Sequence, residues 1–326
     1  MTKATAAPSA KYKRPHKLKY GKWGLIFVLP FFITYFVFQL YPLITTFYKS
    51  FFEEYWDMLE VIGPNYVGFD NYATIIKDGS IVKYFLNTGI IWLIGFVPQL
   101  IMSVLFASWF TDLRMKLKGT GFYKIVLYLP NILMASSVAI LFYNLFGKDG
   151  PVNDILCFMT GASKDTIVFS FFDSVWGTRG IAAFINYLMW TGNTTIMLMA
   201  GIMGVDPALY EAASIDGANA KQLFRKITIP MLKPILLYVM VTSLIGGIQM
   251  FDIPQLLTSG TGSPDNSVTT VVMYLNNNLS VSKNYGKAGA ISVMMFIIAA
   301  ILSIIVFAML NEKKEKPKKK KKGGRR

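Results

Sequence analysis

Residues 211–230 read EAASIDGANAKQLFRKITIP and lie between two strongly apolar segments, residues 180–204 and 232–251. Apolar residues make up 53% of the 326-residue chain, and charged residues only 16%. Long apolar runs with few charges are typical of transmembrane helices, which need about 20 residues to cross a bilayer. The sequence therefore predicts a polar loop that leaves the membrane between two spans.

This loop carries signals for two short helices. Asp206 is a favourable N-cap, and Pro207 suits the first position of a helix. Gly217 predicts a stop at a hinge with Asp216, and Asn219 can cap a second helix. That helix is expected to end near Lys226, before two prolines that should break the chain ahead of the next span, Pro230 and Pro234. The charged side chains are expected to point outward: Glu211, Lys221, Arg225 and Lys226.

Six apolar segments are long enough to be spans. They cover residues 23–47, 85–110, 122–146, 180–204, 232–251 and 288–310. A shorter apolar run, residues 167–176, is interpreted as an interfacial helix or part of an external loop. The predicted fold is an all-α integral membrane protein, with a six-span domain over residues 23–310 and basic tails at 1–22 and 311–326.

Basic residues predict the orientation, because cytoplasmic loops carry an excess of Lys and Arg. Most of the 33 Lys and Arg residues fall in the two tails and in the loops after the second and fourth segments. Both termini are therefore expected in the cytoplasm, at the plasma membrane of a bacterium, with no cleavable signal peptide. Because the charge clusters in this way, the net charge of +15 favours anionic lipid over nucleic acid as a partner.

Several kinds of site are excluded by the sequence. The single cysteine, Cys157, allows no intrachain disulfide, and the single histidine, His16, gives no metal site. The chain lacks the Gly-x-x-x-x-Gly-Lys-Ser/Thr phosphate loop, so it cannot itself be an ATPase. No catalytic residue, metal or cofactor is expected on this chain.

The polar loop resembles the EAA loop of permease subunits of ATP-binding-cassette importers. The matching positions are Glu211, Ala212, Ala213, Asp216, Gly217, Ala218, Phe224, Ile227 and Pro230. Other stretches resemble the carbohydrate, maltose-type branch of that family: residues 68–72, 129–130, 150–153 and 257–264. Together these stretches cover most of residues 23–310.

The resemblance implies a type I importer fold, in which the loop docks as a coupling helix onto a cytoplasmic ATPase. It implies that the partner ATPase dimer binds ATP and magnesium, and that an extracellular solute-binding (lipo)protein delivers a sugar or oligosaccharide. A second, related permease chain is also implied. The family favours a heterodimer, although the residues themselves leave homodimer and heterodimer open.

Two polar stripes inside predicted spans are candidates for the substrate path, because polar side chains in a span are costly unless they face protein or water. One stripe holds Asn186, Trp190 and Asn193, with Met189 adjacent, and the other holds Thr242, Gly246 and Gln249. Each follows an i, i+4, i+7 spacing on one helical face. Amides, hydroxyls and an indole suit a neutral sugar, although such residues also pack helices together. Tyr143 and Asn144 are weaker candidates.

Alternatives to a sugar importer stay open. An ion-coupled secondary transporter usually needs ionisable residues inside its spans, and the middle of every predicted span lacks Asp, Glu, Lys, Arg and His. The lack of a positive charge there also disfavours an anionic solute, and leaves another small neutral solute as the alternative within the family. A membrane enzyme would need an acidic or histidine cluster at an interface. A pure scaffold would not bind an ATPase through residues 211–230.

Overall fold

The computed structural model describes residues 21–112, 117–163 and 169–310. The two predicted basic tails lie outside the described residues, except for residues 21 and 22. The chain divides into two compact units, residues 1–48 and 49–326, each with its own architecture.

The first unit is a single helical run. It consists of α1 (Gly21–Tyr35), a π-helical turn η1 (Phe36–Leu40) and α2, which spans Tyr41–Lys49 and so reaches the first residue of the second unit. Residues 22–49 are long and apolar enough to cross a membrane, which confirms the first predicted span. Pro42 lies two residues after the π turn, where the widened backbone accommodates a residue without an N–H group.

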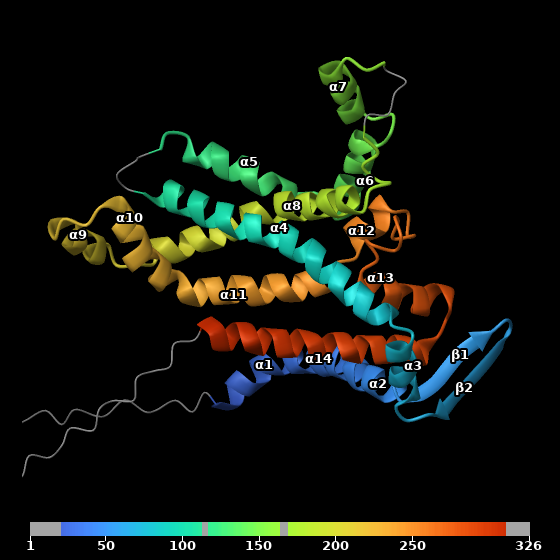
Figure 1. Ribbon diagram of the computed structural model, residues 1–326. Coiled ribbons are helices and arrows are strands. Elements are labelled where there is room, and N and C mark those ends of the chain that lie inside the picture. The colour runs from blue at the N-terminus through green and yellow to red at the C-terminus, as the bar shows by residue number, and fades with distance from the viewer. Residues whose placement is uncertain (1–20, 113–116, 164–168, 311–326) are drawn as a thin grey trace, which may run out of the picture. The chain divides into compact units, whose positions relative to one another are not determined.

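The second unit is helical, with one β-hairpin (Figure 1). Its elements are β1 (Phe52–Asp57), β2 (Glu60–Tyr66), α3 (Asp70–Lys77), α4 (Ser80–Thr111), α5 (Thr120–Ile132), α6 (Ala135–Phe146), α7 (Pro151–Thr160), α8 (Val175–Met203), α9 (Pro207–Ile215), α10 (Ala220–Leu223), η2 (Phe224–Thr228), α11 (Ile229–Ile248), α12 (Asp252–Leu257), α13 (Val271–Asn276), η3 (Asn277–Val281) and α14 (Tyr285–Leu310). The helical membrane fold predicted from the sequence is confirmed. The connections between spans contain more regular structure than expected, since the first holds a hairpin and the last holds three short helical segments.

The number of spans depends on two bent helix pairs. Four helical segments of the described chain are long and apolar enough to cross a membrane, and the total reaches six if each bent pair is one span. One pair is α5 with α6 and α7, bent by 94°, and the other is α8 with α9, bent by 69°. Six spans, as predicted, are thus compatible with the length and composition of the helices.

The third predicted span, residues 122–146, is not one straight helix. α5 ends at Ile132 and α6 begins at Ala135, while Leu133 and Met134 between them adopt extended backbone with ψ of 147° and 132°. Pro130 lacks an N–H group in the last turn of α5 and so weakens the helix just before the bend.

The prediction that Pro230 and Pro234 break the chain is wrong. α10 continues through the π turn η2 into α11, and the N–H of Ile229 donates to the carbonyl of Phe224 across this turn. Pro230 follows this π turn after one residue, where the altered hydrogen-bond pattern accommodates a residue without an N–H group. The second helix of the polar loop is therefore not short, since it is the beginning of the fifth span.

Close backbone contacts hold α8 between its neighbours. A Cβ atom on Gly95 of α4 would lie 2.8 Å from the carbonyl oxygen of Ala183, and one on Gly192 would lie 2.1 Å from that of Leu127 in α5. Small residues allow transmembrane helices to approach in this way. A buried hydrogen bond of 2.8 Å from Gln99 to Thr194 adds a polar link between α4 and α8.

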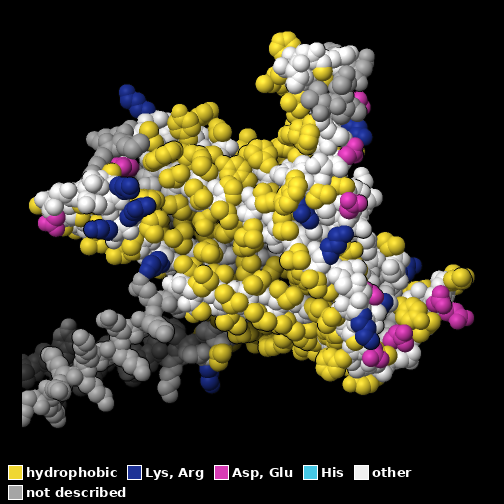
Figure 2. All heavy atoms as spheres, viewed as in Figure 1, with side chains coloured by type: hydrophobic (Ala, Val, Ile, Leu, Met, Phe, Trp, Pro, Cys, Tyr) yellow, Lys and Arg dark blue, Asp and Glu magenta, His cyan; other side chains and the backbone are white. Residues whose placement is uncertain are grey.

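The surface of the bundle has an apolar middle. Figure 2 shows hydrophobic side chains over the central helices on this face, with charged side chains gathered over α9 and α10 and over the β-hairpin. An apolar surface of this extent is typical of a protein that is solvated by lipid.

Candidate functional site

The first candidate site is α9 and the turn that follows it. The Asp206 side chain accepts a hydrogen bond of 2.9 Å from the N–H of Ala208, and Pro207 fills the first helical position. Both features of the predicted helix start are confirmed. The cap satisfies a donor that the helix cannot use internally and fixes where α9 begins.

The C-terminus of α9 is closed by two hydrogen bonds around Gly217. Its φ of +80° lies in the left-handed region, and its N–H donates to the Ser214 carbonyl at 3.1 Å. The N–H of Ala218 donates to the Ala213 carbonyl at 2.9 Å. This pair of bonds is the Schellman arrangement, which favours glycine at the left-handed position. The stop predicted at Gly217 is confirmed.

The N-terminus of the helix after the hinge, α10, is closed by two reciprocal hydrogen bonds between Asn219 and Gln222. The side chain of Asn219 accepts from the N–H of Gln222 at 2.9 Å, and the side chain of Gln222 accepts from the N–H of Asn219 at 2.8 Å. The predicted cap at Asn219 is confirmed, and Gln222 is a further capping residue that its position three residues later indicates. The hinge is thus a defined turn between two capped helices.

The EAA positions form a largely exposed surface. The predicted outward residues Glu211, Lys221, Arg225 and Lys226 are all exposed, as are Ala212, Asp216 and Gly217, whereas Ala213, Ala218, Phe224 and Ile227 are half-buried. Pro230 is exposed at the start of α11. Ile215, at the end of α9, is 86% exposed, which leaves a large apolar side chain in solvent beside the hinge.

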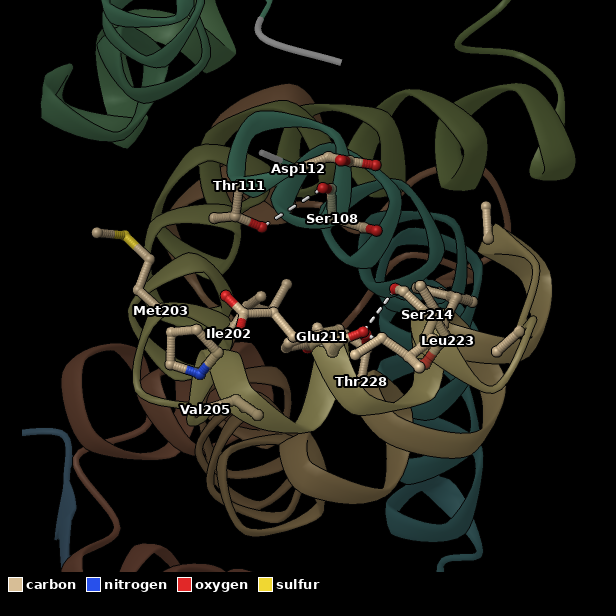
Figure 3. A pocket seen from close by; sticks show the side chains of 16 residues that line it. Ser108, Thr111, Asp112, Ile202, Met203, Val205, Glu211, Ser214, Leu223 and Thr228 are labelled. Atoms are coloured by element: carbon tan, nitrogen blue, oxygen red, sulfur yellow. Dashed lines mark hydrogen bonds between the residues drawn. The ribbon is translucent and has the colours of Figure 1, made fainter. Parts of the chain in front are cut away.

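A cavity of about 980 Å³ lies between α9 and the end of α4. Figure 3 shows Glu211 and Ser214 of α9 and Ser108 and Thr111 of α4 around it. The Tyr210 hydroxyl lies 3.1 Å from the hydroxyl of Thr228 and ties α9 to the end of η2, directly before α11. A hydrogen bond thus joins α9 to the turn that leads into the fifth span, a contact that no sequence pattern indicated.

The second candidate site consists of the two polar stripes on α8 and α11. These helices run antiparallel, since Asn186 contacts the Met250 sulfur at 3.5 Å, while a Cβ on Gly201 would lie 2.3 Å from the Ile235 side chain. Both contacts give the same alignment of α8 along α11. In this alignment Trp190 and Gly246 lie at the same depth in the bundle. The α8 stripe (Asn186, Trp190, Asn193) and the α11 stripe (Thr242, Gly246, Gln249) thus lie at matching depths.

Most members of the stripes are accessible. Trp190 is 48% exposed, Thr242, Gly246 and Gln249 are exposed, and Asn186 and Asn193 are half-buried. Met189 differs, because it is buried in the core cluster around Ile185 and Ile253. Of the weaker candidates, Tyr143 is 45% exposed and Asn144 donates to the Ile140 carbonyl within its own helix.

The segment before α8 is held by an ion pair. The ammonium of Lys148 lies 2.9 Å from the Asp173 carboxylate, which also accepts from Ser170. The hydrogen bond from Lys148, followed by that from Ser170, lowers the pKa of Asp173 below its usual value. Within the described part of residues 167–176, no interfacial helix precedes α8, which begins at Val175.

Within the described residues, no group of three or more His, Cys, Asp or Glu side chains could hold a metal ion. Cys157 is buried in α7.

Comparison with known proteins identifies the family. Residues 88–312 match the model of the family described as "Binding-protein-dependent transport system inner membrane component". The chain belongs to this family and is a permease subunit of an ATP-binding-cassette importer in the inner membrane. The prediction that it is a translocation subunit rather than an enzyme is thereby confirmed.

The relatives are similar over nearly their full lengths. The lactose transport system permease of Rhizobium radiobacter is 30% identical over 288 residues, which cover 88% of this chain and 93% of the relative. The arabinooligosaccharide transport system permease of Bacillus subtilis is 29% identical and covers 85% of each chain. The trehalose/maltose transport system permease of Thermococcus litoralis is 27% identical and covers 86% of this chain and 92% of the relative.

Solved structures support the same fold. A bacterial importer of the acidic polysaccharide alginate matches with a TM-score of 0.74 at 22% identity, over 89% of this chain and 96% of the other. At this identity the match defines the fold alone.

Proposed function

We propose that this chain is one of two permease subunits that carry a sugar or oligosaccharide into the cell by alternating access, driven by a separate cytoplasmic ATPase. The observation that carries the proposal is α9, an exposed helix capped at both ends between two spans. A defined, exposed element joined to a helical bundle suits a lever that biases a two-state equilibrium.

The ATPase is proposed to bind the surface of α9 and its hinge. Ala212 and Ala213 allow close approach of a partner backbone, and the exposed Ile215 offers an apolar anchor. Asp216, Gly217 and Ala218 set the direction of the turn, while Glu211, Phe224, Ile227 and Pro230 complete the surface that resembles the family motif. ATP and magnesium are proposed to bind the partner, and no cofactor is assigned to this chain.

The substrate path is proposed to run along the α8 and α11 stripes. Their matching depth and exposure support a surface that a second permease subunit would close off into a translocation path, and we favour a related but different chain as that subunit. Amides and hydroxyls can donate to sugar hydroxyls, while the Trp190 indole can stack on a sugar ring. Relatives are named for lactose, arabinooligosaccharides and trehalose or maltose, which supports a saccharide as the solute.

An extracellular solute-binding protein is proposed to deliver the saccharide. One related fold is known in complex with a periplasmic protein that holds an alginate pentasaccharide. The β-hairpin of this chain suits such a contact, since Met58 and Leu59 at its tip are 95% and 90% exposed. The distribution of Lys and Arg supports both termini in the cytoplasm, with basic tails at 1–22 and 311–326 on lipid and a permease domain at 23–310.

Reconstitution tests the proposal. The complex that co-purifies with this chain should be placed in proteoliposomes with its binding protein and supplied with labelled saccharides on the outside and ATP on the inside. ATP-dependent uptake of a saccharide is expected. Uptake that follows an ion gradient and needs no ATP would instead support a secondary transporter.

A further inference from the structure

The α8 stripe continues beyond Asn186 to the end of the helix that lies far from α9. Trp190 and Asn193 are three residues apart, and the same aromatic–polar pair occurs 14 residues earlier as Trp176 and Arg179. Fourteen residues are almost four helical turns, so both pairs lie on one face, roughly 21 Å apart along the axis. Asn186 lies midway between Arg179 and Asn193 on that face.

The helix boundary gives Arg179 this position. The predicted span over residues 180–204 begins one residue after Arg179 and so leaves this residue outside the helix. α8 begins at Val175, where the Ser174 side chain caps it by accepting from the N–H of Gly177. Arg179 therefore belongs to the same helical face as the proposed substrate path.

Two hydrogen bonds hold the Arg179 guanidinium, and its other N–H donors have no partner among the described residues. Its Nε donates to the Ser267 carbonyl at 3.0 Å, and its Nη2 donates to Asn87 Oδ1 at 2.6 Å. A guanidinium carries five N–H donors, so three have no partner among the described residues. No carboxylate of the described residues lies within ion-pair distance of Arg179, and its side chain is half-buried.

Trp176 supplies an aromatic surface next to this charge. The Arg179 guanidinium lies 5.3 Å from the centre of the Trp176 ring, and Trp176 is 65% exposed. One ring face is thus polarised by the cation, while the exposed area suits the apolar face of a sugar. The spare N–H groups of an arginine fork match a carboxylate in a bidentate manner.

We propose that Trp176 and Arg179 form an outer subsite on the translocation path that takes an acidic saccharide, with the sugar ring on Trp176 and its carboxylate on Arg179. This inference rests on the proposed sugar function and narrows the solute from saccharides in general to acidic saccharides. The positive charge of Arg179 then lies at the end of a span, where the first turns of α8 and the Ser267 carbonyl hold the side chain.

Lys83 provides a matched control. Its ammonium donates to the Asp265 carbonyl at 2.7 Å, so it anchors the same loop as Arg179. It lies on α4 and so is not part of the α8 face that carries Trp176 and Arg179. A merely structural role of the loop anchors would give Lys83→Gln and Arg179→Gln the same effect on acidic and neutral ligands.

Equilibrium binding to the intact importer complex in lipid nanodiscs tests the subsite, with trigalacturonate and neutral maltotriose as probes. The unmodified complex is expected to bind trigalacturonate at least tenfold more tightly, and this preference should fall as salt screens the charge. Arg179→Gln should remove the preference, whereas Lys83→Gln should keep it. Equal affinities in the unmodified complex, or a preference that survives Arg179→Gln or disappears equally in Lys83→Gln, would overturn the inference.

The same measurement separates this inference from the function on which it rests. If the assembled, ATP-hydrolysing complex binds maltotriose as tightly as trigalacturonate, only the acidic subsite is wrong. If the complex binds and imports neither saccharide, the sugar function is wrong and the subsite with it.

Discussion

Replacing Gly217 by proline should disconnect transport from ATP hydrolysis. Proline fixes φ near −65° and has no N–H, so it can neither adopt the φ of +80° nor donate to the Ser214 carbonyl. The second closing bond, from Ala218 to Ala213, depends on the same left-handed turn. Losing two bonds worth about 0.5–1.5 kcal/mol each should lower the population of the native turn roughly 5- to 150-fold.

Uptake by proteoliposomes and ATP hydrolysis should be measured on the same complex. Gly217→Pro is expected to lower uptake at least fivefold while the complex still assembles, because no span is altered and nothing lies within 4 Å of the Gly217 Cβ position. Gly217→Asn is the matched control, since asparagine tolerates the left-handed region and keeps the N–H. Equal uptake by the proline variant, the asparagine variant and the unmodified chain would refute the role of this turn.

Three further changes test other parts of the structure. Asn186→Leu combined with Gln249→Leu should change the saccharide uptake profile while assembly with the ATPase is kept; an unchanged profile assigns both residues to helix packing. Gly192→Ala forces a Cβ to 2.1 Å from a rigid backbone carbonyl and should cost roughly 1–3 kcal/mol of stability. Its thermal unfolding midpoint should therefore be lower than that of the control Gly89→Ala, whose Cβ meets nothing within 4 Å. At neutral pH the unmodified chain should be more stable than Asp173→Asn, because an acid whose pKa is lowered in the folded state stabilises that state while it is ionised. This difference in stability should be lost as the pH falls below 3.8 and through the lowered pKa of Asp173. A difference that persists in strong acid contradicts the ion-pair account.

Local signals in the sequence predicted the α9 region well. Asp206, Pro207, Gly217 and Asn219 each act through a neighbouring backbone group, and such short-range effects are encoded within a few residues. The apolar segments were predictable for a related reason, because a bilayer requires about 20 apolar residues in succession wherever the chain crosses it.

Features that depend on alternative backbone geometry were missed. The expectation for Pro230 assumed α-helical hydrogen bonds, whereas the π turn before it removes the conflict. The bend at Leu133 and Met134 likewise depends on how α5 and α6 pack, which the apolar pattern of residues 122–146 does not report.

The arrangement of the substrate stripes needed the fold. Their spacing was visible along the chain, but their common depth follows from the contacts Asn186–Met250 and Gly201–Ile235 between two helices. The span predicted from residue 180 left Arg179 outside the helix, although the capping serine at 174 would have moved that boundary.

Photo-crosslinking from Ile215 tests the central claim most directly. A photoreactive residue at this exposed position of α9 should form an adduct, in native membranes, with an ATPase that carries a phosphate-binding loop. The same group at Met58, on the hairpin tip, should give no such adduct. Failure of Ile215 to crosslink to any ATPase, in membranes where the importer is active, would contradict coupling through α9.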